Sequence, residues 1–270
     1  MDILNLLQYS FIQKAFIAGA FVSVVCSVLG VFLVLRKMSL IGDGLSHVSF
    51  GAIAFGLFLG VYPFYIAIPI VMLSSILILN ISQKAKIYGD SAIGIVSAIG
   101  ISTGLILTSI SGGFNVDLFS YLFGNILAVS NLEVIMSVVL SIIVLLVVYL
   151  FYWDFFAETY DEEFAQVSGI KTKYLNTILA LLTSVTVVLA TKTVGVMLVS
   201  ALLILPAVSA LQIAKNFKST LIIATIISLI SVIIGIILSF VLNLPTGATI
   251  VIVNAFFLLF TIILKRIRIK

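Results

Sequence analysis

The stretch RKMSLIGDGLSHVSFGAIAFG, residues 36–56, holds the only histidine of the chain, His47, four positions after Asp43. Side chains four positions apart lie over one another on a helix, so this pair is predicted to bind one cation. A charged side chain near the centre of a membrane-spanning helix costs about 2.5–3.5 kcal/mol and is usually kept for a transport pathway or a partner. Small residues let helices approach closely, and four glycines surround the pair: Gly42, Gly44, Gly51 and Gly56. The stretch is therefore predicted to be a metal-handling helix inside a bundle.

The composition identifies a membrane protein. Hydrophobic residues make up 63% of the 270 positions and charged residues only 9%, which is too apolar for a water-soluble domain of this size. We therefore predict an all-α, polytopic membrane bundle with a single transmembrane domain, residues 1–270. The one cysteine, Cys26, excludes a disulfide framework and a thiolate cluster for zinc or iron–sulfur. The net charge of +4 comes from basic residues at the ends of apolar runs, a pattern of membrane orientation and not of nucleic-acid binding.

Nine apolar runs are long enough to cross the membrane. They are predicted at 11–35, 44–61, 64–81, 92–110, 134–152, 174–190, 193–214, 217–242 and 247–264. The run at 193–214 contains Gly195 and Pro206, so it is predicted to be broken, and eight spans remain if it does not fully cross. Residues 118–129 are too few for a span and predict a short interfacial or re-entrant helix at the outer face. Residues 154–173 form an acidic, amphipathic segment in which Gly169 is placed to end a short helix.

The basic residues set the predicted orientation, because cytoplasmic loops are rich in Lys and Arg. With nine spans, all but Lys14 and Lys192 of the 14 basic residues share the cytoplasmic face: Arg36, Lys37, Lys84, Lys86, Lys171, Lys173, Lys215, Lys218, Lys265, Arg266, Arg268 and Lys270. The N-terminus is then outside and the C-terminus cytoplasmic. Lys192 is predicted to reach the membrane surface with its long side chain, and Asp117 and Glu133 to be solvated loop or capping residues.

Depth is the one difficulty for the Asp43/His47 pair. Asp43 follows Arg36 by only seven residues, so hydropathy alone places it near the cytoplasmic end of its span. An unwound connection at Ile41 and Gly42 would move the pair deeper into the membrane.

Three motifs in order carry a family resemblance: LRKMSLIGDGLSHVSFGAIAFG at 35–56, VDLFSYLFGNILAVS at 116–130 and VGVMLVSALLILPAVSALQIAK at 194–215. Together they resemble the ABC-type zinc/manganese/iron permease family over nearly the whole chain. That family's first motif has an Asp and a His at this spacing, which implies Asp43 and His47 as the metal-facing pair. The part from Tyr174 onward, including LPTG at 244–247, is also similar to the cobalamin and siderophore permeases, which implies their helical fold.

The resemblance also implies contacts with an ATPase subunit. By analogy the ATPase docks on the polar segment after the Pro206 span, with Phe217 as the predicted aromatic anchor in the partner's groove. The residues of this coupling segment are Ala214, Lys215, Asn216, Phe217 and Lys218. The acidic segment at 162–169 is a second candidate for a cytoplasmic contact.

The predicted function is that of the membrane permease of an ATP-driven importer for a divalent cation, with zinc favoured and manganese next. The sequence has no phosphate-binding G-x-x-x-x-G-K-[ST] motif, so the permease is not an enzyme and ATP hydrolysis is expected in a separate subunit. With one histidine and no H-E-x-x-H motif, a membrane metalloenzyme is disfavoured. A stand-alone metal channel or secondary transporter is the alternative, and co-purification with an ATPase distinguishes it.

The expected partners follow from that function. They are the ATPase, an external metal-binding protein, membrane lipid and a second copy of the chain. Because zinc is usually four-coordinate and one chain offers two ligands, a two-fold dimer is predicted to complete the site, with the flanking glycines permitting the approach. No permanently bound cofactor is expected.

Overall fold

The computed structural model describes residues 9–84, 88–113 and 116–268, and every element within those residues is a helix. Two of the basic residues above, Lys86 and Lys270, lie outside them. The long helices are α2 (Ser10–Leu35), α3 (Ile41–Phe58), α4 (Pro63–Lys84), α5 (Gly89–Ile110), α7 (Asn131–Leu150), α10 (Thr172–Thr193), α11 (Val199–Ile213), α12 (Phe217–Leu242) and α13 (Thr246–Arg268). The short ones are α6 (Val116–Phe123), η1 (Ile126–Ala128), α8 (Tyr152–Tyr160), α9 (Glu162–Val167) and η2 (Val196–Leu198).

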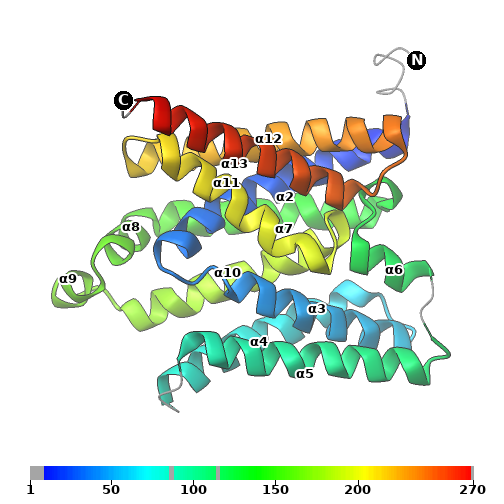
Figure 1. Cartoon of the computed structure of the whole chain (residues 1–270). Coiled ribbons are helices and arrows are strands. Elements are labelled where there is room, and N and C mark those ends of the chain that lie inside the picture. The colour runs from blue at the N-terminus through cyan, green and yellow to red at the C-terminus, as the bar shows by residue number, and fades with distance from the viewer. Residues whose placement is uncertain (1–8, 85–87, 114–115, 269–270) are drawn as a thin grey trace.

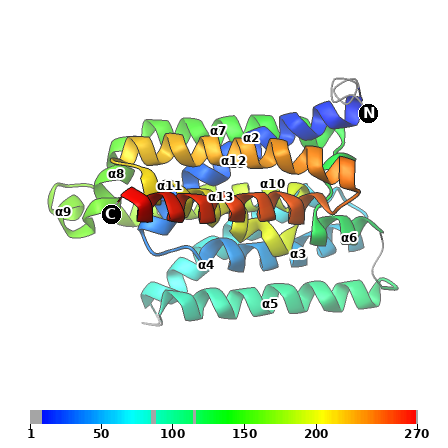
Figure 2. The same cartoon turned by 45° about the horizontal axis from the view of Figure 1, so that its top comes forward.

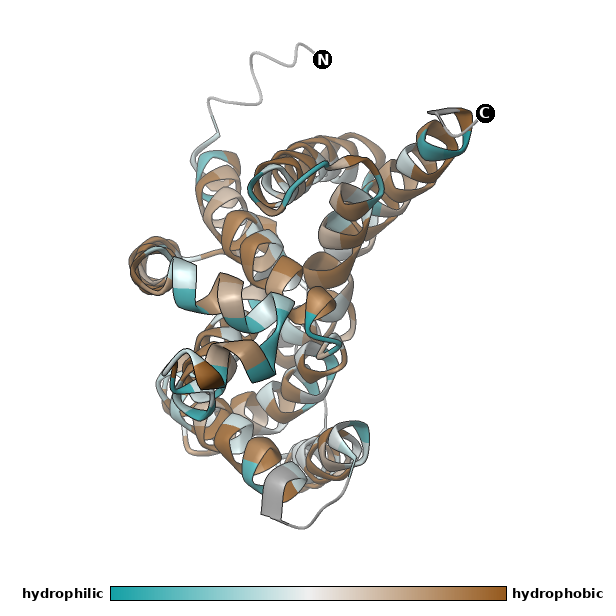
Figure 3. Cartoon of the chain, turned by 90° about the vertical axis from the view of Figure 1, so that its left-hand side faces the viewer, coloured by the Kyte–Doolittle hydropathy of each residue, from teal (hydrophilic) through white to brown (hydrophobic). Residues whose placement is uncertain are grey.

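Nine helices in the described part are long and apolar enough to cross a membrane, which confirms the nine predicted spans. They lie side by side along one direction, with α8 and α9 at one end of the bundle and α6 at the other (Figures 1 and 2). The segment predicted to be too short for a span forms α6 and η1, and α9 ends just before Gly169, whose φ is 88°. Hydrophilic residues gather at the end that carries α8 and α9, whereas the long helices are mostly hydrophobic (Figure 3).

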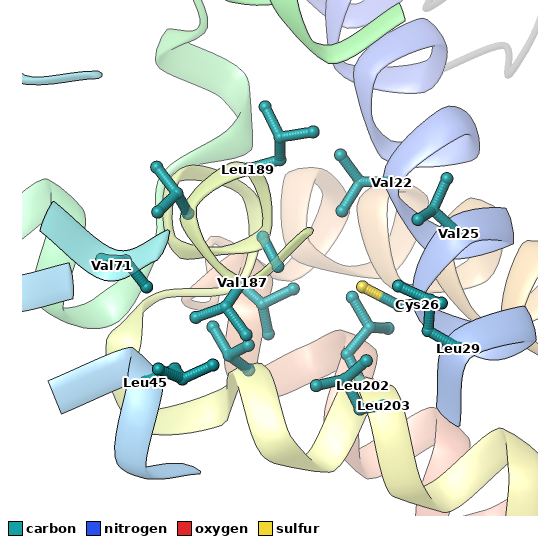
Figure 4. Close-up of a cluster of buried hydrophobic side chains, with 14 of the residues drawn as sticks. Val22, Val25, Cys26, Leu29, Leu45, Val71, Val187, Leu189, Leu202 and Leu203 are labelled. Atoms are coloured by element: carbon teal, nitrogen blue, oxygen red, sulfur yellow. The ribbon is translucent and has the colours of Figure 1, made fainter. Parts of the chain in front are cut away.

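The core of the bundle lies between α2, α3, α10 and α11. Apolar side chains of α2 face those of α10 and α11 there, and Cys26 is one of the fully buried residues (Figure 4). Helices α2, α3 and α10 are buried along most of their length, whereas α4, α5 and α7 keep most of their surface outside the packed core. Apolar surface of that kind is what a helix presents to lipid.

Glycines explain why α3 lies so close to its neighbours. A Cβ atom at Gly51 would lie 2.3 Å from the carbonyl oxygen of Gly100 in α5, and a Cβ at Gly44 would lie 2.4 Å from a methyl group of Ile93. A Cβ at Gly42 would meet Leu203 of α11 at 2.6 Å. The prediction that α3 lies inside a bundle is confirmed, and its glycines are already used for packing within the chain.

The predicted broken span is interrupted at Gly195, whereas α11 continues as a helix through Pro206. Gly195 has a φ of 92° and lies back to back with Gly124, whose φ is 75°. A Cβ at Gly124 would lie 2.3 Å from the carbonyl carbon of Val194, and one at Gly247 would lie 2.0 Å from the Val194 oxygen. We call Gly124, Gly195 and Gly247 the glycine joint. It holds α6, the α10–α11 break and the start of α13 together at one end of the bundle.

Candidate functional site

The connection between α2 and α3 sets the depth of the Asp43/His47 pair. Lys37 turns the chain with a φ of 57°, and residues 36–40 run back along the bundle before α3 begins (Figures 1 and 2). The helix is intact from Ile41, so the unwound segment lies earlier than the predicted Ile41–Gly42 position. Helix α3 therefore starts within the length of the bundle that α2 covers (Figures 1 and 2).

Asp43 and His47 face each other on α3. Asp43 Oδ2 lies 3.7 Å from His47 Nε2, and the side chains are 47% and 25% exposed, respectively. Zinc-type bonds to oxygen and nitrogen are each about 2.0–2.2 Å, so one cation can reach both atoms without a change of backbone. The carboxylate also lies in the first turn of α3, where the helix dipole stabilises a negative charge.

Neighbouring side chains contact Asp43 Oδ1 and enclose His47 Nδ1, but the pair stays partly exposed. Ser200, in the first turn of α11, donates a hydrogen bond from Oγ to Asp43 Oδ1 at 3.2 Å. His47 Nδ1 is buried and has no hydrogen-bond partner among the described residues, so Nε2 is the ring nitrogen open to a ligand. Sequence reasoning missed Ser200, because a lone serine in an apolar helix has no distinguishing pattern.

The described part of the chain brings two possible metal ligands together at this point. Within the described residues no group of three or more His, Cys, Asp or Glu side chains is placed to hold an ion. Asp43 and His47 together supply one oxygen and one nitrogen donor, a set that suits zinc, manganese or iron when further donors are added.

Lys192 and Glu133 form a buried ion pair, with Lys192 Nζ 3.4 Å from Glu133 Oε1. The ammonium also lies 4.5 Å from the centre of the Tyr121 ring, a cation–π contact. The prediction that Lys192 reaches the membrane surface is therefore wrong. Glu133 is a cap, as predicted, in a capping box with Ser130, but it is buried and not solvated. The Ser-x-x-Glu spacing was the sequence signal for that box; the side chain of Asp117 lies outside the described part.

A second buried ion pair, Arg36 with Glu158, joins the C-terminal end of α2 to α8. Arg36 binds Glu158 through two hydrogen bonds, of 2.8 and 3.3 Å, and also donates to Asn176 of α10. Burial raises the pKa of Glu158 to about 7; the charge of Glu162 adds to the rise, and Arg36 opposes it. Sequence reasoning treated Arg36 only as an orientation signal, because its partner is 122 residues away.

Phe217 belongs to the interior of this end of the bundle. It is 5% exposed, and its ring lies 5.3 Å from that of Phe32 and 5.1 Å from that of Phe156. The prediction that Phe217 inserts into a partner's groove is wrong, because its ring is already enclosed by the chain. Around it, Lys215, Asn216 and Lys218 are exposed and Ala214 is half-buried, and Asn216 caps α12.

Sequence and structure comparisons identify the family. The family model described as the ABC 3 transport family matches residues 8–265.

The chain belongs to the ABC 3 transport family.

Two curated relatives of this ABC 3 permease are named for different metals. It is 36% identical over 249 residues to the manganese transport system membrane protein MntC of Listeria monocytogenes, which covers 92% of this chain and 89% of the relative. It is 33% identical over 249 residues to the high-affinity zinc uptake system membrane protein ZnuB of Haemophilus influenzae, covering 92% and 95%. The ABC 3 permease is thus the membrane subunit of an importer and not its ATPase.

Solved structures show the same fold. A chain of PsaBC from Streptococcus pneumoniae, in complex with Fab, is 31% identical and superimposes with a TM-score of 0.87, covering 96% of this chain and 93% of that one. An inward-facing putative metal-chelate type ABC transporter is 18% identical with a TM-score of 0.71, covering 91% and 82%. The second match concerns the fold alone and confirms the predicted architecture.

Helix α9 of the ABC 3 permease, which is not one of the candidate spans, exposes two apolar side chains. Phe164 is 64% and Val167 is 88% exposed on this six-residue helix, which Asp161 caps by accepting from the Phe164 N–H. Acidic residues flank them at Glu162 and Glu163. This segment, the second of the two contact candidates in the sequence, has the exposed side chains that Phe217 lacks.

Proposed function

We propose that this permease carries manganese or zinc inward, with Asp43 and His47 as ligands along the path. The observation that carries the proposal is the facing pair, Asp43 Oδ2 and His47 Nε2 at 3.7 Å, with both side chains partly exposed. Relatives named for manganese and for zinc match over similar lengths. Oxygen and imidazole donors serve both metals, so we propose the two metals and not zinc alone.

We further propose that a second copy of the chain completes the site. Two carboxylates and two imidazoles, brought together across a two-fold axis, give the four ligands that zinc usually has. The exposed side of Asp43 supports this arrangement. The glycines of α3 do not provide the approach between copies, since they are filled by neighbours within the chain.

The transport cycle assigned to this site needs three partners. An external binding protein delivers the cation, the paired permeases hold it, and ATP binding and hydrolysis in a separate subunit open the path inward. The ATPase docks on the cytoplasmic side, where we place α9 and the exposed residues of 214–218. The permease lies in the cell membrane with its N-terminus outside and its C-terminus in the cytoplasm, as the distribution of basic residues favours.

The metal site is tested by uptake of radioactive manganese and zinc into vesicles that carry the whole importer. We expect Asp43→Ala and His47→Ala to abolish uptake while leaving the complex assembled. Asp90→Ala, which removes an exposed acid of α5, is the matched control and should transport normally. A complex with one wild-type and one His47→Ala chain should be badly impaired; transport at the full rate by that complex would exclude the shared site.

The docking surface is tested by co-purification of the ATPase with the permease. Phe164→Ala should weaken this association by at least tenfold, whereas Phe58→Ala, which removes an aromatic side chain of similar exposure at the far end of α3, should not. If the wild-type chain transports metal without any ATPase, the stand-alone channel or secondary transporter is the correct function.

The orientation is tested with an impermeant thiol reagent. The native Cys26 is fully buried, so single cysteines at Ser111 and Lys215, both exposed, report on opposite ends of the bundle. Ser111→Cys should react from outside and Lys215→Cys should not. The opposite pattern would invert the orientation.

A further inference from the structure

We infer that Ser200 is a positioning residue for the cargo: it fixes one oxygen of the Asp43 carboxylate so that the other faces His47. This inference rests on the proposed function of Asp43 and His47 as metal ligands. The observation behind it is the 3.2 Å hydrogen bond from Ser200 Oγ of α11 to Asp43 Oδ1 of α3. The two residues are 157 positions apart in the sequence.

The two oxygens of Asp43 have different neighbours. Oδ1 accepts the hydrogen bond of Ser200, and Oδ2 lies 3.7 Å from His47 Nε2. The last torsion of an Asp side chain is broad, so the helix alone does not decide which oxygen points toward His47. A hydroxyl that donates to one oxygen removes that freedom. Ligating carboxylates are commonly held by such a hydrogen bond, and its loss typically weakens metal binding by 10–100-fold.

The backbone around Ser200 is itself held in place. The first turns of α3 and α11 touch, since a Cβ at Gly42 would lie 2.6 Å from Leu203 Cδ1, and Asp43 and Ser200 form the next contact between the same two helices. The short helix η2 (Val196–Leu198) and then α11 follow the break at Gly195, which Gly124 and Gly247 enclose.

Contacts at the C-terminal end of α10 also hold the break in position. The Lys192 carbonyl accepts a hydrogen bond from the Asn125 N–H at 3.2 Å, and the Lys192 ammonium pairs with Glu133. The α10–α11 break therefore places the Ser200 hydroxyl against α3. If the helix continued through Gly195, Ser200 would not lie in the first turn of a new helix.

The experiment measures manganese uptake, and zinc uptake separately, by the complete importer reconstituted with its binding protein. Ser200→Ala should raise the KM by about tenfold or more and leave the maximal rate per assembled complex nearly unchanged. Ser200→Thr, which keeps a hydroxyl, should restore a KM close to that of the wild type. Ser200→Val has nearly the shape of threonine without the hydroxyl, and it should behave like Ser200→Ala.

Ser209→Ala is the matched control on the same helix. Ser209 is fully buried, and its hydroxyl donates to the Leu205 carbonyl of its own helix, so its loss should leave the KM unchanged.

The Asp43→Asn variant tests the proposed metal site separately from the proposed role of Ser200. Uptake by Asp43→Asn at the wild-type rate would overturn the proposed metal site itself. If Asp43→Asn is inactive while Ser200→Ala and Ser200→Val keep the wild-type KM, only the role of Ser200 is overturned. Equal impairment of the Thr and Val variants would also overturn it, since packing and not the hydroxyl would then matter.

Discussion

Both ends of the bundle bury an acidic side chain against a basic one, whereas the acid at the start of α3 is left half open. Arg36 and Glu158 are 7% and 0% exposed and 2.8 Å apart, and Lys192 and Glu133 are nearly as enclosed. Asp43 is 47% exposed, and its Oδ2 atom lies 3.7 Å from Nε2 of His47. The enclosed pairs join helices that are distant in the sequence. The half-open pair lies within one helix, and the hydrogen bond from Ser200 of α11 to Asp43 links it to another helix.

The largest expected effect comes from breaking an enclosed pair. Glu158→Ala leaves the guanidinium of Arg36 buried without a counter-charge, which should cost about 3–5 kcal/mol and prevent stable assembly at pH 8. Asp43→Ala removes a half-exposed acid and its hydrogen bond from Ser200, so it should cost only about 1 kcal/mol. Thermal unfolding of the purified complexes compares them. Equal melting temperatures for these two variants would remove the distinction between the two kinds of pair.

The next largest loss of stability is expected from Phe217→Ala, because the ring of Phe217 is buried within the chain. Phe217→Ala should destabilise the permease by about 3 kcal/mol through the cavity left among the rings of α2, α8 and α12. Phe164→Ala should leave the melting temperature of the isolated permease unchanged, since Phe164 is exposed. A stable Phe217→Ala permease that fails only in binding the ATPase would restore Phe217 as the docking residue.

Breaking the Lys192–Glu133 pair should give a smaller effect. Lys192→Met should cost about 2 kcal/mol, because Glu133 loses its counter-charge but keeps its hydrogen bond from the Ser130 N–H. In a double-mutant cycle with Glu133→Gln the two losses should not add, because each variant removes the same interaction. Additive losses would show that the two side chains act independently.

The smallest expected effect is the change in the stability of the wild type between about pH 5.5 and 6.5. Because the pKa of Glu158 is raised to about 7, the folded chain holds a proton there that the unfolded chain loses near pH 4.5. Stability should therefore fall as pH rises from about 4.5 to 7, by at most about 1.4 kcal/mol per unit. Glu158→Gln cannot titrate, so its melting temperature between pH 5.5 and 6.5 should fall less than that of the wild type. Identical slopes for both proteins would exclude Glu158 as the source.

The number of spans was predictable because each depends on local composition. Apolar runs of about 20 residues, separated by Lys, Pro or Gly, are read directly along the chain, and Gly195 marked its break in the same way. Asp43 and His47 were predictable as a pair because both lie on one helix, four positions apart. Their depth was not, because it depends on the path of residues 36–40, which no periodicity encodes.

The enclosed pairs were missed for a related reason. Hydropathy places Lys192 and Arg36 at the ends of spans, and ends are usually solvated, so their partners on other helices were not anticipated. Phe217 follows the same logic: its position after a polar turn indicated exposure, whereas α8 folds back and covers it. Contacts between residues that are distant in the sequence are decided by packing, and a single sequence does not contain that information.

The glycine joint has a consequence for how relatives of this permease can be recombined. Gly124, Gly195 and Gly247 are separated by 71 and 52 positions, yet the space for a methyl group on each is occupied by backbone atoms of another joint segment. Backbone atoms cannot rotate away as a side chain does, so no single compensating change near one glycine makes room. The three segments are therefore expected to tolerate substitution only when all three change together. A chimaera that takes residues 120–130 from one relative should take 192–196 and 245–248 from that same relative to fold.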